Sequence, residues 1–266
     1  MWLSSSSTQR VDLLLIFLLI YTLRSVAAQT LGISLDGGAR SDAKRVVYSA
    51  KLSFDQDTET LFNDAQLYGL ARLAFQEMQG KFQRDKIQLS YRPSMVGVMA
   101  MGKVVYISSS LKGDSFIYTH ADTRLKPSLT TALQRCQTSL QDSPLLSSDR
   151  SYRVRASCSE VLAVQQSYLD DDVPKDQKVT AHAPRVAAFG RTGRIGPVRA
   201  QYPCEGDDEG PDGGFVTWGC RQFMDEEGIK TPKRPEDADI NLPSPFPTFT
   251  SRQISVACPE PKSHKL

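Results

Sequence analysis

The chain has 266 residues, of which 40% are apolar and 23% are charged. These values are ordinary for a globular protein, and the length is enough for one good-sized core or one decorated domain. The formal net charge of +2 excludes a strong bulk field that would draw the chain to nucleic acid or an anionic membrane, so polyanion binding requires a local patch.

The first 28 residues have the pattern of a secretory signal peptide. Arg10 precedes an apolar run over Leu13–Leu23, and small residues follow up to Ala28. The run is shorter than the roughly 20 apolar residues that cross a bilayer, and no later stretch is long enough. We expect cleavage after Ala28 and a secreted mature protein without a stable membrane anchor; an uncleaved anchor is the alternative.

Three elements are predicted before residue 110. Residues 29–60 are expected to form an N-terminal arm with one strand-like run at Arg45–Phe54. A largely buried helix is predicted over Phe62–Gly80, because apolar residues recur every three to four positions. Two β-rich runs, Ser94–Ala100 and Lys103–Ser108, flank a glycine turn, which predicts a β-hairpin.

Helices and strands are also predicted to alternate in the second half of the chain. The predicted segments are helices at Pro127–Leu140, Ala156–Leu169 and Cys220–Glu227, and strands at Arg185–Phe189, Pro197–Tyr202 and Ile229–Thr231. Asp170 to Asp172 are expected to end the second of these helices, because acidic side chains oppose the dipole there. The order indicates an α/β fold of the three-layer type, with helices packed on a sheet. From Pro232 the chain is Pro-rich and aperiodic, and residues 232–266 are expected to form a tail that is disordered or lies on the surface.

The five cysteines are an odd number for a chain in an oxidising compartment, so they cannot all pair internally. Three cysteines that bind a metal and two that form a disulfide would account for all five. Cys158 and Cys220 lie at predicted helix starts, and Cys204 follows a strand-like run. A helix N-terminus stabilises a thiolate, which suits a zinc ligand, and three ligands leave one zinc position open for water. Disulfides among these cysteines are the alternative.

The residues around these cysteines resemble the cytidine deaminase-like superfamily, which carries a His- or Cys-x-Glu at one helix start and a Pro-Cys-x-x-Cys at the next. The first motif is Cys158-Ser159-Glu160, and the second begins at Pro203-Cys204 and ends at Gly219-Cys220. The split second motif is also similar to one in a group of fungal secreted proteins. The resemblance implies a deaminase-like domain over residues 61–231 with N- and C-terminal extensions. It also implies zinc on the three cysteines and Glu160 as proton carrier. Alternatively, Glu160 complements the helix dipole.

The second motif departs from the family in one respect. The 15 residues 205–219 separate Cys204 from Cys220, where the family has two. The entropic cost of closing a loop grows logarithmically with loop length, so this insertion costs on the order of 2 kcal/mol. Because a structural zinc supplies about 10 kcal/mol or more, the site tolerates the insertion if the fold holds both of its ends.

Several other residues are candidates for binding or cross-linking. Phe215 and Trp218 could stack on a base, or could equally anchor the insertion to the core. Arg199, with the neighbouring Arg185, Arg191 and Arg194, could contact phosphates of a nucleotide or of a single-stranded nucleic acid, or could form a solvated loop. A disulfide between Cys136 and Cys258 would tie the tail to the core, and two free buried thiols are the alternative.

Three functions remain open from the sequence. The first is a secreted, zinc-dependent hydrolytic deaminase acting on a nucleobase, either in a free nucleoside or in nucleic acid. The second is a non-catalytic secreted effector or binding protein on the same scaffold. The third is a metal-free secreted domain held by disulfides.

Overall fold

We describe the fold from a computed structural model. The structure describes residues 30–40, 45–113, 129, 131–134, 136, 156–173, 179–193, 195–204 and 219–256. Leu31 to Leu266 cluster as one compact unit. Among the described residues, no helix has the length and apolar content needed to cross a membrane.

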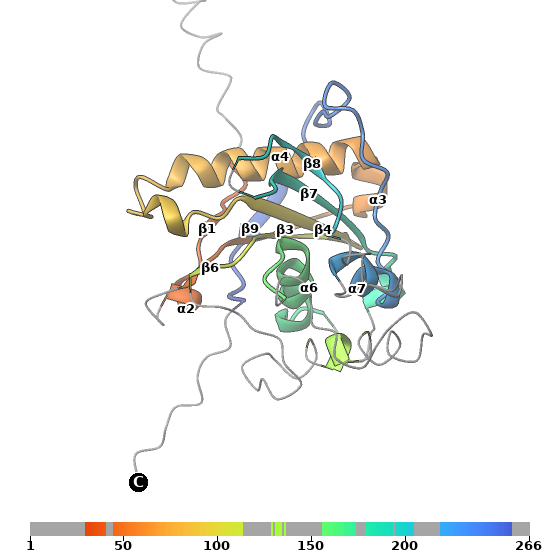
Figure 1. Ribbon diagram of the computed structural model, residues 1–266. Coiled ribbons are helices and arrows are strands. Elements are labelled where there is room, and N and C mark those ends of the chain that lie inside the picture. The colour runs from red at the N-terminus through yellow and green to blue at the C-terminus, as the bar shows by residue number, and fades with distance from the viewer. Residues whose placement is uncertain are drawn as a thin grey trace, which may run out of the picture. The chain divides into compact units, whose positions relative to one another are not determined.

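A seven-stranded sheet in the order β1-β3-β5-β4-β7-β8, with β9 also paired to β3, forms the centre of this unit (Figure 1). Its strands are β1 (Ser34–Leu35), β3 (Tyr48–Phe54), β4 (Met95–Met101), β5 (Val104–Ser109), β7 (Arg185–Arg191), β8 (Val198–Gln201) and β9 (Phe249–Arg252). All the named strand pairs are antiparallel. The short strands β2 (Arg45–Val46) and β6 (Lys112–Gly113) form a separate pair. The predicted α/β class is therefore confirmed, with an antiparallel sheet.

The predicted hairpin is present as β4 and β5. Met101 pairs with Val104 next to the turn, and the pairing continues to Val96 opposite Ser109. The turn between them contains Gly102 with φ of 53°, a left-handed conformation that glycine adopts without steric cost. The predicted strands near residues 185 and 197 are also present, as β7 and β8. Instead of a last strand at residues 229–231, Lys230 forms one isolated parallel bridge to Arg185.

Helices cover both faces of the sheet (Figure 1). The longer helices are α4 (Asp64–Lys81), α6 (Ser159–Leu169) and α7 (Cys220–Glu226), and the short ones are α2 (Gly37–Arg40), α3 (Thr58–Leu61), η1 (Leu89–Tyr91) and η2 (Val179–His182). One core lies between α4 and the sheet, and a second core lies between the sheet and the helices α6 and α7. This layering places the beginnings of α6 and α7 on the same face.

The predicted helix boundaries agree closely with the structure for α4, α6 and α7. Helix α4 begins two residues after its predicted start, because Asn63 and Gln66 form a reciprocal capping box there. Helix α6 ends at Leu169 with Asp170 as its C-cap, as the acidic run indicated. Of the predicted helix over residues 127–140, the described positions are helical, and Leu129, Leu133 and Cys136 are fully buried.

The structure differs from the prediction in the roles of the arm and the tail. Within the predicted arm, β3 is an interior strand that pairs with β5 on one side and with β1 and β9 on the other. The tail supplies β9 and buries Ile240 and Val256, so the expectation that it is disordered or superficial is wrong for these residues. Pairing between strands some 200 residues apart leaves no periodic signal in the tail itself, so its sequence resembled a surface segment.

A buried ion pair joins the end of α6 to the sheet. The Lys51 ammonium lies 2.5 Å from the Asp170 carboxylate, and both side chains are at most 2% exposed. Arg252 on β9 also contacts Asp170, and the Tyr106 hydroxyl donates a hydrogen bond to it. Burial acts to raise the pKa of Asp170, but hydrogen bonds from Lys51 and Tyr106 outweigh it and hold this pKa below its usual value. The acid that ends α6 thus fixes the helix against β3, β5 and β9.

Candidate metal centre

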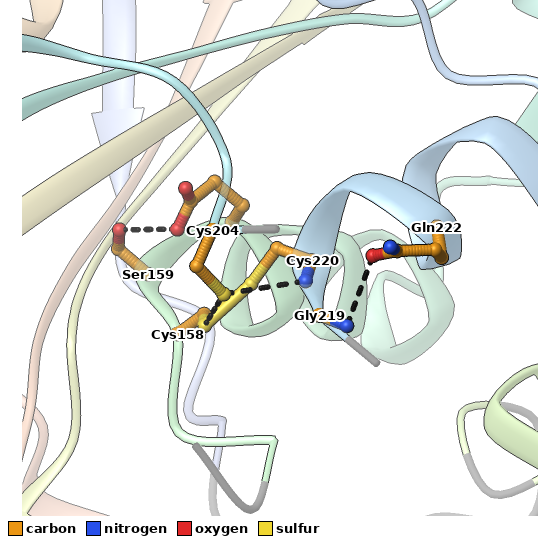
Figure 2. Close-up of a disulfide and its surroundings, with 7 residues drawn as sticks. Cys158, Ser159, Cys204, Gly219, Cys220 and Gln222 are labelled. Atoms are coloured by element: carbon orange, nitrogen blue, oxygen red, sulfur yellow. Dashed lines mark hydrogen bonds between the residues drawn. A yellow bond between two sulfur atoms is a disulfide. The ribbon is translucent and has the colours of Figure 1, made fainter. Parts of the chain in front are cut away.

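Three of the five cysteines meet at one point of the structure. The sulfurs of Cys158, Cys204 and Cys220 all lie within 4.8 Å of one another, although 62 residues separate the outer two in the chain. Cys158 is the N-cap of α6, Cys220 is the first residue of α7, and Cys204 follows β8 (Figure 2). The structure therefore brings together the three cysteines that the sequence predicted as one site.

The cluster contains a disulfide as well as a potential set of metal ligands. Cys158 and Cys220 are joined by a disulfide, and the Cys204 sulfur lies 3.5 Å from that of Cys158. The sequence had posed zinc ligation and disulfide bonding as alternatives, and both arrangements use the same sulfurs here. No other group of three metal-ligating side chains converges in this way among the described residues.

The N-terminal ends of α6 and α7 place backbone N–H groups and partial positive charge at the cluster. The backbone N–H of Cys220 donates a hydrogen bond to the Cys204 sulfur at 3.3 Å, and the N–H of Gly219 donates to the Gln222 side chain at 3.0 Å (Figure 2). Unpaired N–H groups and the positive end of the helix dipole favour negative charge at such a position. The Cys204 sulfur therefore lies at the N-terminal end of α7 and accepts one of its backbone N–H groups.

The donor set fits a thiophilic divalent metal. Thiolates suit zinc, whose tetrahedral sites are built from sulfur and nitrogen ligands. The Cα atoms of Cys158 and Cys220 are 7.1 Å apart, beyond the range of about 4.4–6.8 Å that is usual for directly bonded cysteines. This backbone spacing is compatible with an ion between the sulfurs, and three ligands leave one position of a tetrahedral ion for a further group.

Glu160 lies in the first turn of α6, two residues after Cys158. Its side chain is buried, with 4% exposure, and accepts a hydrogen bond of 2.8 Å from the Ser159 hydroxyl. Burial raises the pKa of the Glu160 carboxyl above its usual value, although its own backbone N–H and Ser159 act to lower it. Its place in the first turn of α6 is also the position at which an acid complements the helix dipole, so both roles given to Glu160 by the sequence agree with this geometry.

The close approach of α6 to the sheet depends on Gly97, in the middle of β4. A Cβ atom at Gly97 would lie 2.9 Å from the backbone nitrogen of Glu160 and from the carbonyl carbon of Ser159. A larger residue would therefore push the first turn of α6, and with it Glu160, away from the sheet. Neither Gly97 nor the contact of Ser159 was predicted from the sequence, although a glycine inside a strand is a recognised sign of close backbone approach.

A groove of about 660 Å³ adjoins the cluster. Its lining comprises Tyr202, Pro203, Arg221, Asp225, Gly228, Ile229, Lys230 and Thr231. Pro203 and Arg221 directly precede and follow ligand cysteines in the chain, so the backbone that holds the sulfurs also forms the wall of the groove. The cysteines and Glu160 are not themselves part of that lining.

Tyr68 connects Glu160 with the groove electrostatically. Burial raises the pKa of the Tyr68 hydroxyl, and the charges of Tyr202 and then Glu160 add to this rise. Tyr202 lines the groove, and the Arg234 guanidinium lies over its ring at 5.6 Å. Glu160 and the aromatic wall of the groove are thus both within electrostatic range of one hydroxyl group.

The predicted substrate-binding residues are only partly described. Arg199 is exposed on β8, and its neighbour Ala200 packs into the core on the α4 side, so strand alternation places Arg199 on the α6 side. Arg185 instead contacts Asp64 and the Phe62 carbonyl, which is a structural role. The other candidates, Phe215, Trp218 and Arg194, lie outside the described residues.

Cys136 is a free cysteine in the structure, which is the alternative to the predicted disulfide with Cys258; Cys258 itself lies outside the described residues. Cys136 is a fully buried free thiol in the core beneath α6. Burial raises the pKa of this thiol, and the charges of Glu226 and Glu227 raise it further, so Cys136 is unreactive compared with the cluster.

Comparison with known proteins found no match among protein-family models, curated proteins or solved structures. The three cysteines, Glu160 and the surfaces beside them are therefore the features that bear on function.

Proposed function

We propose that the chain is a zinc-dependent hydrolytic deaminase that acts on a nucleobase. The observation that carries this proposal is the convergence of three cysteine sulfurs within 4.8 Å, with a buried carboxyl two residues after the first of them. The reaction replaces an exocyclic amine by a carbonyl oxygen: water adds to the amine-bearing carbon, and ammonia leaves. It requires an activated water molecule and a group that moves protons.

The zinc ligands in this proposal are Cys158, Cys204 and Cys220. A zinc ion held by three protein ligands lowers the pKa of a bound water to about 7, which supplies the nucleophile at neutral pH. The chain contributes the positions of the sulfurs, since two of them lie at helix beginnings and the third accepts an N–H from one of those helices. Gly97 contributes by letting α6 lie against β4.

Glu160 is the proton carrier in this proposal. Its carboxylate takes up the two protons of the attacking water one after the other, and delivers the first to the ring nitrogen and the second to the leaving amine. Its position in the same helical turn as Cys158 keeps it beside the cluster, and the Ser159 hydroxyl orients one of its oxygens at 2.8 Å. Burial excludes bulk water from the carboxyl, so proton transfer is directed toward the bound substrate.

The groove beside the cluster is the proposed place for the rest of the substrate. Tyr202 offers an aromatic face, and Arg221 and Lys230 offer positive charge next to it. Aromatic stacking and cationic side chains are the means by which proteins hold bases and phosphates. Arg199, on the α6 side of β8, is proposed to extend this surface.

A second function is favoured by the Cys158–Cys220 disulfide itself. If that bond is permanent, the chain is a disulfide-held domain without zinc, and the groove serves binding alone. A non-catalytic effector on the same scaffold is the related alternative if zinc binds without turnover.

Two measurements separate these functions. Purified under reducing conditions, the protein is expected to contain one equivalent of zinc and to release ammonia from at least one member of a panel of cytosine- and adenine-containing nucleosides, nucleotides and single-stranded oligonucleotides. Zinc without ammonia release would support the non-catalytic effector. A zinc-free protein under the same conditions would contradict both zinc-dependent functions and leave the disulfide-held domain.

We also propose that residues 1–28 direct export and are removed. When the chain is produced in a eukaryotic secretory host, the protein in the medium is expected to begin at Gln29, because small residues precede the proposed cleavage site after Ala28. Edman sequencing or intact mass measurement of that protein tests the prediction. Retention in the membrane fraction with an intact N-terminus would contradict it.

A further inference from the structure

We propose that the cysteine cluster is a redox switch: the three reduced thiolates hold zinc, and oxidation of Cys158 and Cys220 to a disulfide releases it. The inference rests on the proposed zinc site and goes beyond it by assigning a modification site and a regulatory role to the same residues. It follows from the fact that one set of sulfurs forms both a metal-binding cluster and a disulfide.

The two states exclude each other chemically. A sulfur in a disulfide is no longer a thiolate and loses the negative charge with which it binds zinc. Oxidation of Cys158 and Cys220 leaves Cys204 as the remaining cysteine ligand in the cluster. Loss of a single outer-shell contact already weakens metal binding by about 10–100-fold, so loss of two direct ligands empties the site.

Burial sets the order of the oxidation steps. Cys158 is partly exposed whereas Cys220 is fully buried, so a low-molecular-weight disulfide such as oxidised glutathione reaches Cys158. The Cys158 thiolate attacks that disulfide, forms a mixed disulfide and expels one glutathione thiolate. The Cys220 thiolate then attacks the Cys158 sulfur and expels the second glutathione thiolate. Two protein thiolates have lost two electrons in total, and the oxidant has gained them.

Cys204 can assist the return to the reduced state by thiol–disulfide exchange. Its sulfur lies 3.5 Å from that of Cys158 and accepts the Cys220 N–H, so it is within reach of the Cys158–Cys220 bond. Attack by Cys204 on the Cys158 sulfur forms a Cys158–Cys204 bond and releases the Cys220 thiolate. An external thiol can attack either residue of this new bond, whereas in the Cys158–Cys220 bond only Cys158 is partly exposed, so exchange with Cys204 adds a second route of reduction beside direct attack on Cys158.

The test follows zinc and disulfides together. The zinc-loaded protein is equilibrated in glutathione buffers of increasing oxidised-to-reduced ratio. Released zinc is measured with a chromogenic chelator, and disulfides are mapped by alkylation and peptide mass spectrometry. Zinc loss and Cys158–Cys220 formation are expected to share one midpoint, with Cys204 still open to alkylation. Reduction by a phosphine followed by added zinc is expected to restore full occupancy.

Two variants extend this experiment: one is a control outside the cluster, and the other removes a sulfur of the cluster. Cys136→Ala removes a buried thiol outside the cluster and is expected to leave the midpoint unchanged. Cys204→Ser is expected to form the same disulfide, but its reduction by glutathione should slow about twofold or more, because only direct attack on Cys158 remains of the two routes. An unchanged reduction rate would contradict the role given to Cys204.

The outcomes also separate this inference from the proposed function. Zinc that stays bound while the buffers become oxidising, or zinc that leaves without the Cys158–Cys220 bond, would overturn the switch and leave the zinc enzyme standing. A reduced protein that binds no zinc would overturn both.

Discussion

Glu160→Gln is expected to lower kcat about 10³-fold while the bound zinc stays at one equivalent. A glutamine fills the same buried space beside Ser159 but cannot take up and return a proton, and general acid–base catalysis commonly contributes 10²–10⁴-fold. A 10³-fold loss corresponds to about 4 kcal/mol of transition-state stabilisation. The measurement is steady-state ammonia release, with zinc content determined on the same samples. KM is expected to change little, because the loss concerns the transition state rather than ground-state binding.

Glu227→Gln is the matched control for this result. Glu227 is also a buried acid, with 6% exposure, but it accepts a hydrogen bond from Tyr168 at the end of α7, and a glutamine oxygen can accept the same bond. This variant is expected to keep nearly full activity. If Glu160→Gln kept activity like this control, Glu160 would not be the proton carrier.

Local patterns in the sequence were sufficient for most of the elements that hold the site. The hairpin of β4 and β5, and the helices α4, α6 and α7, were predicted within a few residues, because each has its own periodicity, turn or cap. The neighbours of β3 were not predicted. Its pairing with β9 depends on contact between residues near 51 and 252, and such distant contacts follow from the complete fold rather than from any short segment.

In the candidate site, too, some features were predicted from the sequence and others are known only from the structure. Cys158, Cys204 and Cys220 were predicted from their positions at the ends of elements and Glu160 from the family resemblance, and the structure brings the three sulfurs together. The bond between Cys158 and Cys220 was not specified, because several pairings of the cysteines agree with the same sequence. The supporting contacts were also missed, since the space available at Gly97 is known only once α6 lies on β4.

The proposed export and the proposed switch constrain each other. A chain that enters an oxidising compartment with its cysteines reduced will form the Cys158–Cys220 bond unless zinc occupies the cluster first. Export would therefore make the enzyme depend on zinc loading during folding, and zinc supply in the compartment would determine which state is released. The disulfide and the metal site are then two products of one folding reaction.

Lys51→Met is expected to lower the free energy of unfolding by about 3 kcal/mol, because it removes the buried one of the two cations that contact Asp170 and leaves only the half-exposed Arg252. For a domain of this size that corresponds to a fall in Tm of about 10 °C, measured by calorimetry. Arg84→Met is the control. Arg84 is 68% exposed and pairs with Asp85 at the surface, where an ion pair contributes about 1 kcal/mol at most.

The pH dependence of the free energy of unfolding distinguishes loss of the ion pair from a simple packing defect in Lys51→Met. The pKa of Asp170 is lowered in the folded protein, so the stabilisation is present above the ordinary carboxyl pKa and is lost as the pH falls through the folded value. The stability gap between the wild type and Lys51→Met should therefore narrow in acid, and Lys51→Met/Asp170→Asn should recover part of the loss at neutral pH. A gap that stays constant with pH would mean that Lys51 acts through its packing, and the end of α6 would then not be held by charge.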